Sequence, residues 1–304
     1  MSKSKKPSNP NSGSNADESC DTTTQACPLD CPSKIEFKEH NTVYGFDDYT
    51  NSDVPWKSVE KDKSDTVKAK ISPGGKFANV QFTSSNASNV TVSPSSPSSG
   101  SQVVKVTGAK KGESEIKAGC GGSNYGKIKV KSYSRKSKTV AVRLVHEKNY
   151  TSTDISDATI KSYLKKVYEQ AVFEFKITRL PAKTVEFDLN KDGKIDVGSW
   201  MSAEMRKIRD ECKDDSYDHN IFLVDKPNDG SLGYMSFNQR YGFVHTDNSN
   251  HPGNTVAHEL GHGSFGLVHP DQKTPADNDK KNIMHSDEPS PWRLRKNQWD
   301  KINP

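Results

Sequence analysis

The chain has 304 residues, enough for about two domains of ordinary size, and 31% of them are hydrophobic. Its 44 basic and 39 acidic residues give a net charge of +5, and no basic block is interleaved with aromatic side chains, so the composition gives no warrant for nucleic-acid binding. No apolar run approaches the roughly 18 residues of a membrane helix, and no basic segment followed by an apolar one stands at the start. We therefore expect no membrane insertion and no recognisable secretion signal.

Residues 1–34 are rich in Ser, Asn, Thr and Pro and contain almost no large apolar side chains. Such a segment buries too little surface to repay the entropy of ordering, so we predict a disordered tail. The tail holds Cys20, Cys27 and Cys31, three of five cysteines whose odd number and irregular spacing are not typical of a disulfide framework. A metal cluster of these thiols would lack a fourth ligand nearby, which favours free or locally bridged cysteines.

Residues 35–136 are predicted to form a β-sandwich. Polar and apolar side chains alternate at 66–71, 103–107 and 127–130, as in strands with one wet face, and clusters of Ser, Pro and Gly separate these segments. The stretch VTVSPSSPSSGSQVVKVTGAKKGESEIKAGCGGSNYGKIKV resembles bacterial immunoglobulin-like repeat domains. That resemblance implies a spacer or a binding platform for a surface partner or a secretion machine.

The remainder of the chain, residues 137–304, has a mixed α/β pattern. Apolar residues predict strands at 140–145, 173–177 and 221–224. Apolar positions at helical spacing across 160–171 predict an amphipathic helix between the first two strands. We expect a sheet with crossover helices packed on it, and a functional site attached to that sheet.

The candidate metal ligands and general base lie in one segment, His258-Glu-Leu-Gly-His262-Gly-Ser-Phe-Gly-Leu-Val-His269. On a helix, His258 and His262 project from one face, where two imidazole nitrogens can take adjacent corners of a Zn²⁺ tetrahedron. Glu259 points toward the same cleft and can act as the general base. Gly266 can end the helix and turn the chain so that His269 becomes the third ligand. Three ligands and an open position are typical of catalytic zinc, and an ordinary surface helix with polar histidines is the alternative.

This segment resembles the metzincin metalloproteases, whose pattern is His-Glu-x-x-His-x-x-Gly-x-x-His followed by a tight turn with a methionine beneath the metal. Asn282-Ile-Met-His285 is similar to that turn, which implies that Met284 forms the floor of the zinc site. The resemblance also implies a closing helix, which would begin near Ser290, and an edge strand before the active-site helix that pairs with substrate. The residues expected in that edge strand are Gly242, Phe243 and Val244.

The chain departs from the family pattern at one point. Six residues separate His262 from His269 where the family has five, because one residue is inserted before the glycine. Asp271 and Glu288 are therefore alternative candidates for the third ligand. Some members of the family have a tyrosine ligand two residues after the methionine, but this chain has Ser286 there, so that ligand is absent.

A second metal signal precedes the strand predicted at 221–224. Its acidic and amide residues have the spacing of a calcium-binding loop, with a glycine at the sharp turn. The candidate ligands are Asp188, Asn190, Asp192 and Asp196. The twelfth position of such a loop is Ser199 instead of a bidentate glutamate, so another carboxylate such as Glu204 would have to complete the site. A hydrated turn rich in Asp, Asn and Gly is the alternative.

These observations predict a multidomain protein with a disordered tail, an immunoglobulin-like β-sandwich and a C-terminal α/β metzincin-like domain. The predicted function is that of a zinc-dependent metalloendopeptidase acting on protein or peptide substrates, with Zn²⁺ as cofactor, Ca²⁺ as a candidate second ion and Glu259 as general base. The alternatives are a zinc amidase acting on cell-wall peptides, and an adhesion or binding protein with a vestigial protease domain. A protease with a spacer and no signal peptide indicates export by a leaderless route.

Overall fold

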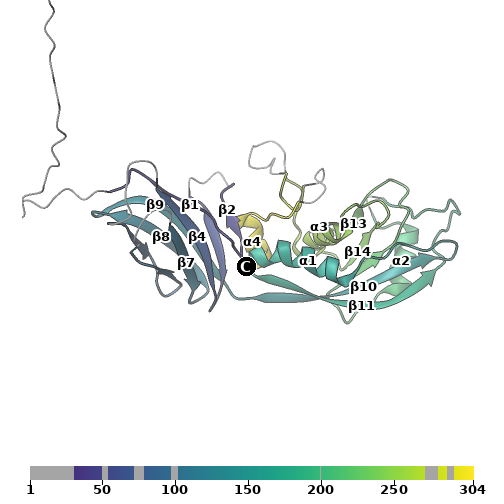
Figure 1. Ribbon diagram of the computed structural model, residues 1–304. Helices are drawn as coiled ribbons and strands as arrows, with labels where there is room; N and C mark the ends of the chain where they lie inside the picture. Colours follow the sequence, from purple (N-terminus) through teal and green to yellow (C-terminus); the bar gives the residue numbers. More distant parts are fainter. Residues whose placement is uncertain are drawn as a thin grey trace, which may run out of the picture.

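The computed structural model describes residues 31–49, 54–71, 79–96, 102–198, 200–270, 280–285 and 291–304. Figure 1 shows an all-β part, coloured purple to blue, beside a part that mixes helices and strands. Several residues considered above lie outside the described ranges, namely Cys20, Cys27, Ser199, Asp271, Ser286, Glu288 and Ser290.

The all-β part consists of two sheets that share a core. One sheet has the strand order β1-β4-β7-β6 and the other β2-β3-β9-β8-β5. The strands are β1 (Ile35–Glu39), β2 (Phe46–Asp47), β3 (Trp56–Glu60), β4 (Ser64–Ile71), β5 (Gln81–Ser84), β6 (Val90–Ser93), β7 (Gln102–Gly108), β8 (Gly112–Cys120) and β9 (Ser123–Tyr133). The three predicted strands lie within β4, β7 and β9, where every second side chain is buried, so the alternating pattern is confirmed. We call the described residues of 31–133 the sheet pair; its immunoglobulin-like character stays a prediction.

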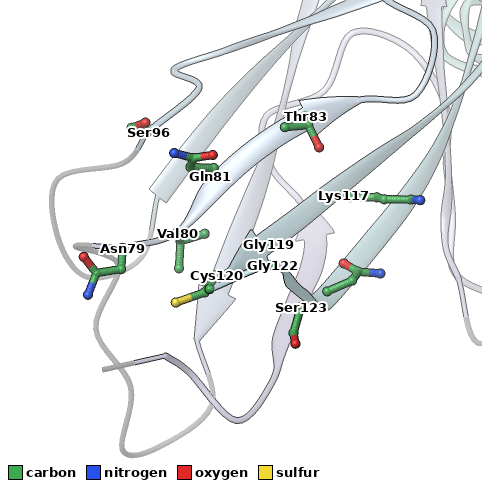
Figure 2. A pocket seen from close by; sticks show the side chains of 12 residues that line it. Asn79, Val80, Gln81, Thr83, Ser96, Lys117, Gly119, Cys120, Gly122 and Ser123 are labelled. Atoms are coloured by element: carbon green, nitrogen blue, oxygen red, sulfur yellow. The ribbon is translucent and has the colours of Figure 1, made fainter. Parts of the chain in front are cut away.

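A disulfide closes one end of the sheet pair. Cys31 is bonded to Cys120, the last residue of β8, across a sequence separation of 89. Figure 2 shows Cys120 beside the hairpin between β8 and β9, among mostly polar side chains. The expectation of free or locally bridged thiols is therefore wrong for Cys31, because the fold joins two cysteines that are far apart in the sequence. In the chain-entropy model, closing a loop of this length stabilises a fold by roughly 4–5 kcal/mol.

The α/β part is built on a sheet with the strand order β11-β10-β12-β14-β13. Its strands are β10 (Lys136–Glu147), β11 (Phe173–Val185), β12 (His219–Leu223), β13 (Gly233–Met235) and β14 (Tyr241–Val244). β10 pairs in parallel with β11 and β12, β12 pairs in parallel with β14, and β13 is antiparallel to β14. The predicted strands coincide with β10, β11 and β12, which confirms a sheet-rich, mixed α/β architecture.

Helices cover both faces of this sheet. α1 (Asp157–Tyr168) and α3 (Pro252–Phe265) pack on one face, in a core that continues into the sheet pair, whereas α2 (Ala203–Cys212) packs on the other face in a second core. α1 occupies the predicted helical segment, and the 3-10 turn η1 (Glu169–Ala171) continues it. No helix among the described residues is long and apolar enough to cross a membrane.

The short helix α4 (Lys296–Ile302) lies between the two parts (Figure 1). The sequence predicts a closing helix that begins near Ser290, so the predicted start is wrong by more than a helical turn. The N–H groups of Trp292 and Arg293 donate hydrogen bonds to the carbonyl of Lys281 at 2.8 and 2.7 Å. This segment therefore pairs with the turn before Met284 instead of coiling into a helix, because its backbone groups already have partners there.

Candidate metal centre

Three histidines converge at the end of α3. The Nε2 atom of His258 lies 3.1 Å from that of His262 and 3.1 Å from that of His269, and the Nε2 atoms of His262 and His269 are 3.2 Å apart. Nitrogen ligands of one tetrahedral Zn²⁺ lie about 3.3–3.4 Å apart, so the three imidazoles fit one face of such a tetrahedron. Among the described residues, no other His, Cys, Asp or Glu side chains gather into a comparable group of three.

The end of α3 explains how His269 reaches the other two histidines. The helix continues through Phe265, so the inserted residue lies within it, and Gly266 then adopts a left-handed conformation with φ of 59°. The N–H of Gly266 donates to the carbonyl of His262, and the next N–H donates to the carbonyl of Gly261, which closes the helix end. The chain then reverses, and His269, which is itself exposed, returns to the face of the helix that carries His258 and His262.

Backbone carbonyls fix the first two imidazole rings. Nδ1 of His258 lies 2.8 Å from the carbonyl oxygen of Ile283, and Nδ1 of His262 lies 2.6 Å from that of Leu267. Each Nδ1 can therefore donate its proton, which leaves the lone pair of Nε2 directed into the site. Burial lowers the pKa of His258 to about 3 and that of His262 to about 4. Both rings are consequently neutral near pH 7, the form that binds metal ions.

Glu259 lies beside the histidines, 6% exposed. Burial raises the pKa of its carboxyl to about 8, although a backbone hydrogen bond from Met235 favours the ionised form. β13 passes very close to this side chain, because a Cβ atom at Gly233 would lie 2.7 Å from Oε1 of Glu259. A carboxyl group with this pKa is suited to exchange protons near neutral pH.

Met284 packs beneath the helix that carries the histidines. Its side chain is fully buried, and a Cβ atom at Gly261 would lie 2.7 Å from its sulfur. Asn282 shapes the turn, because its Oδ1 accepts the N–H of Met284 at 3.0 Å and its carbonyl accepts the N–H of His285 at 2.9 Å. A Cβ atom at Gly263 would likewise lie 2.3 Å from the sulfur of Met235. Gly261 and Gly263 therefore each allow a methionine to approach the helix closely.

The edge strand of the sheet differs from the sequence prediction. Gly242, Phe243 and Val244 lie in β14, which has β12 on one side and β13 on the other, so their predicted edge position is wrong. β13 (Gly233–Met235) forms the edge instead and lies against Glu259. With three residues, β13 is too short to produce a recognisable alternation in the sequence.

A hollow of about 390 Å³ opens beside Glu259 between β13, α3 and the turn that holds Met284. Its lining includes Tyr234 of β13, Asn254 and Thr255 of α3, and His285 after the turn, together with the three converging histidines. The sequence gives no reason to assign His285 to the site, because its position depends on the turn that follows Asn282. The hollow leaves open space next to the carboxyl group of Glu259 and the three histidines.

The predicted calcium loop is an ordered turn stabilised by its own backbone. Oδ2 of Asp188 accepts the N–H of Gly193 at 2.8 Å, and Oδ1 of Asn190 accepts the N–H of Asp192 at 3.0 Å. Glu204 reaches the loop, as a calcium site lacking a glutamate at the twelfth position would need. Its Oε2 accepts the N–H of Asp196 at 2.7 Å. These contacts suit a turn with or without an ion, so calcium binding stays a prediction.

No protein-family model matches this chain, and no curated protein matches it. Among solved structures, domains 4 and 5 of the S-layer protein SbsC match 25% of this chain and 40% of that chain, with 31% identity and a TM-score of 0.22. Metalloproteinase-II from Bacteroides fragilis matches 81% of this chain and 84% of that chain, with 13% identity and a TM-score of 0.39. A chaperone–substrate complex matches 65% of this chain and 37% of that chain, with 14% identity and a TM-score of 0.35. At these TM-scores, none of the three likenesses identifies the activity of this chain.

Burial of Glu259 predicts a pH-dependent stability of the metal-free protein. Its pKa is raised from 4.5 to about 8, so its contribution to folding is fully present below pH 4.5 and is lost as the pH rises through 8. Each pKa unit corresponds to about 1.4 kcal/mol of stability. Because the buried carboxyl is charged only at high pH, a substitution that removes the charge stabilises the fold most at high pH. We expect metal-free Glu259→Gln to unfold at a higher temperature than the wild type at pH 8 and at a similar one at pH 4.5. Equal midpoints at both pH values would show that the carboxyl is not desolvated.

Proposed function

We propose that this protein is a zinc-dependent metalloendopeptidase. The observation that carries the proposal is the convergence of three Nε2 atoms, 3.1–3.2 Å apart, beside a buried carboxyl group and an open hollow. Three imidazoles that leave a fourth position open, two of them kept neutral by burial, match a catalytic zinc site better than a structural one. In this proposal His258, His262 and His269 hold the ion.

The residues of the site suit peptide-bond hydrolysis. A zinc ion held there would supply Lewis-acid activation of water and of the scissile carbonyl. Glu259 accepts a proton from the attacking water and later delivers it to the leaving amine, which its raised pKa favours. The edge strand β13 has a strand neighbour on one side only, and in this proposal an extended peptide adds along its other side, next to Glu259. Met284 supports the helix turn that carries His258 and His262.

Metal removal tests the proposal. The purified wild type is expected to contain about one zinc ion per chain and to cleave an unfolded protein substrate internally. Treatment with a chelator is expected to abolish cleavage, and added Zn²⁺ should restore it, because backbone carbonyls hold the neutral rings of His258 and His262 in place without the ion. Elemental analysis and the sizes of the cleavage products measure both expectations. Cleavage that survives complete removal of zinc would overturn the proposal.

We further propose that the loop of Asp188, Asn190, Asp192 and Asp196 binds Ca²⁺. Glu204 supports this proposal because it brings a further carboxylate to the loop. At a Ca²⁺ concentration a hundred times the Kd, binding would stabilise the fold by about 2.7 kcal/mol, seen as a higher unfolding temperature. Asp192→Asn keeps an oxygen acceptor for the Lys194 N–H but removes a charge, so it should lose most of this increase. A wild type that unfolds at the same temperature with and without Ca²⁺ would refute the site.

A further inference from the structure

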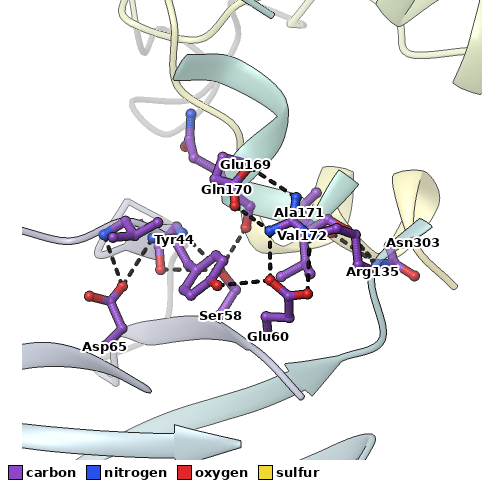
Figure 3. Close-up of polar contacts among 12 residues, drawn as sticks. Tyr44, Ser58, Glu60, Asp65, Arg135, Glu169, Gln170, Ala171, Val172 and Asn303 are labelled. Atoms are coloured by element: carbon purple, nitrogen blue, oxygen red, sulfur yellow. Dashed lines mark hydrogen bonds and ion pairs between the residues drawn. The ribbon is translucent and has the colours of Figure 1, made fainter. Parts of the chain in front are cut away.

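The sheet pair contacts the α/β part through the buried turn η1. Oγ of Ser58, on β3, donates to the carbonyl of Gln170 at 2.6 Å (Figure 3). The same Oγ accepts the N–H of Gly45 at 2.7 Å. Ser58 is fully buried. A Cβ atom at Gly45 would lie 2.3 Å from the indole of Trp299 on α4, so the two parts pack here without room for any side chain.

The side chain of Gln170 continues this contact toward the metal centre. Its Nε2 donates to the carbonyl of Trp292 at 2.7 Å, and its Oε1 accepts the N–H of Leu294 at 3.0 Å. Gln170 is 5% exposed. A buried amide that uses both its donor and its acceptor on one backbone segment acts as a strand partner for that segment. Gln170 therefore fixes the chain between Trp292 and Leu294.

That segment in turn holds the backbone that orients a histidine of the site. The N–H of Arg293 donates to the carbonyl of Lys281, and the carbonyl of Arg293 accepts the N–H of Ile283 at 2.8 Å. The carbonyl of Ile283 is the acceptor for Nδ1 of His258 at 2.8 Å. A continuous series of hydrogen bonds thus runs from Ser58 in the sheet pair, by way of Gln170, to the imidazole of His258.

We propose that Gln170 is a positioning residue for the metal centre. We also propose that the sheet pair, through the hydrogen bond from Ser58 to Gln170, helps to orient His258. The proposal rests on the proposed metal-binding role of His258. The acceptor of the second ring N–H orients a metal-binding histidine, and disturbing such partners typically weakens metal binding about 10–100-fold. The sheet pair is accordingly more than a detachable spacer, because its removal would release η1 and the backbone of Ile283.

Two variants and one matched control test this inference. Gln170→Met keeps the length of the side chain but removes its donor and acceptor, and Ser58→Ala removes the hydroxyl that bonds Gln170. Ile116→Ala, at a fully buried position of β8, weakens the core of the sheet pair without touching the series of hydrogen bonds. The full-length proteins are compared in their Zn²⁺ dissociation constants, by competition with a chelating indicator, and in the absorption spectra of their Co²⁺ complexes.

Gln170→Met is expected to weaken Zn²⁺ binding about tenfold or more and to alter the Co²⁺ spectrum. Ser58→Ala should change the Zn²⁺ dissociation constant and the Co²⁺ spectrum in the same direction as Gln170→Met does. Ile116→Ala should lower only the unfolding temperature. A folded Gln170→Met protein with the affinity and spectrum of the wild type would overturn the inference. If Gln170→Met does not fold, Ser58→Ala decides by the same criterion.

Failure of the proposed function gives a different result. A wild type that binds no zinc would overturn the proposed function, and the NMR signal of the Nδ1–H group of His258 in the metal-free protein then tests the positioning role by itself. A change of that signal in Gln170→Met, but not in Ile116→Ala, supports the role of Gln170. An unchanged signal in Gln170→Met contradicts it.

Discussion

Glu259→Ala is expected to slow peptide hydrolysis by about 10²–10⁴-fold while leaving the zinc content near one ion per chain. The carboxyl group is buried and lines the same hollow as the converging histidines, whereas backbone carbonyls hold the imidazoles of His258 and His262 without involving Glu259. Under the proposed function, losing the carboxyl therefore removes proton transfer without removing the proposed metal ligands. Elemental analysis together with kcat on a peptide substrate measures the two effects separately.

Glu147 provides a matched control for this variant. It is also a buried glutamate, 2% exposed, at the end of β10 and outside the lining of the hollow beside Glu259. Glu147→Ala should change the unfolding temperature but leave kcat within error of the wild type. Loss of zinc from Glu259→Ala, or retention of its full activity, would contradict the role assigned to the carboxyl group.

Asp65→Asn is expected to lower the free energy of unfolding by about 3–5 kcal/mol, because it leaves a buried charge without its partner. Nζ of Lys57 lies 2.6 Å from Oδ2 of Asp65, and their side chains are 0% and 3% exposed. The same Oδ2 atom accepts the N–H groups of Val43 and Tyr44, at 3.1 and 3.0 Å, and so fixes the segment before Gly45. Chemical denaturation of both proteins measures the loss.

The pH dependence of this loss has a definite sign. Burial lowers the pKa of Lys57 to about 8 even with Asp65 ionised beside it, and without that carboxylate the pKa falls further. A lysine with a depressed pKa costs stability as the pH falls through that value. The difference in the free energy of unfolding between the wild type and Asp65→Asn should therefore be large at pH 6 and become smaller as the pH rises through 8.

An exposed ion pair serves as the control for Asp65→Asn. Glu36 and Lys34 lie 2.8 Å apart on the surface of the sheet pair, so Glu36→Gln should leave the denaturation midpoint almost unchanged. A midpoint shift equal to that of Asp65→Asn would mean that burial of the Lys57–Asp65 pair has no special energetic weight.

The sequence by itself determined the features that depend on local periodicity. Alternation at 66–71, 103–107 and 127–130 predicted strands that the structure contains, because side chains of a strand alternate between core and solvent over two residues. The four-residue spacing of His258 and His262 placed both on one helical face, since a helix repeats every 3.6 residues. Gly266 predicted the helix end for an equally local reason, its tolerance of a left-handed backbone.

Only the tertiary structure decided which distant residues meet. The approach of His269 to His258 required the whole turn after α3, and the bond between Cys31 and Cys120 joined positions with no common local pattern. β13, with three residues, carried no periodic signal, so the edge of the sheet was assigned to its neighbour. The burial that raises the pKa of Glu259 is a property of several packed elements at once. Such contacts depend on loop closure between remote segments, which no window of sequence contains.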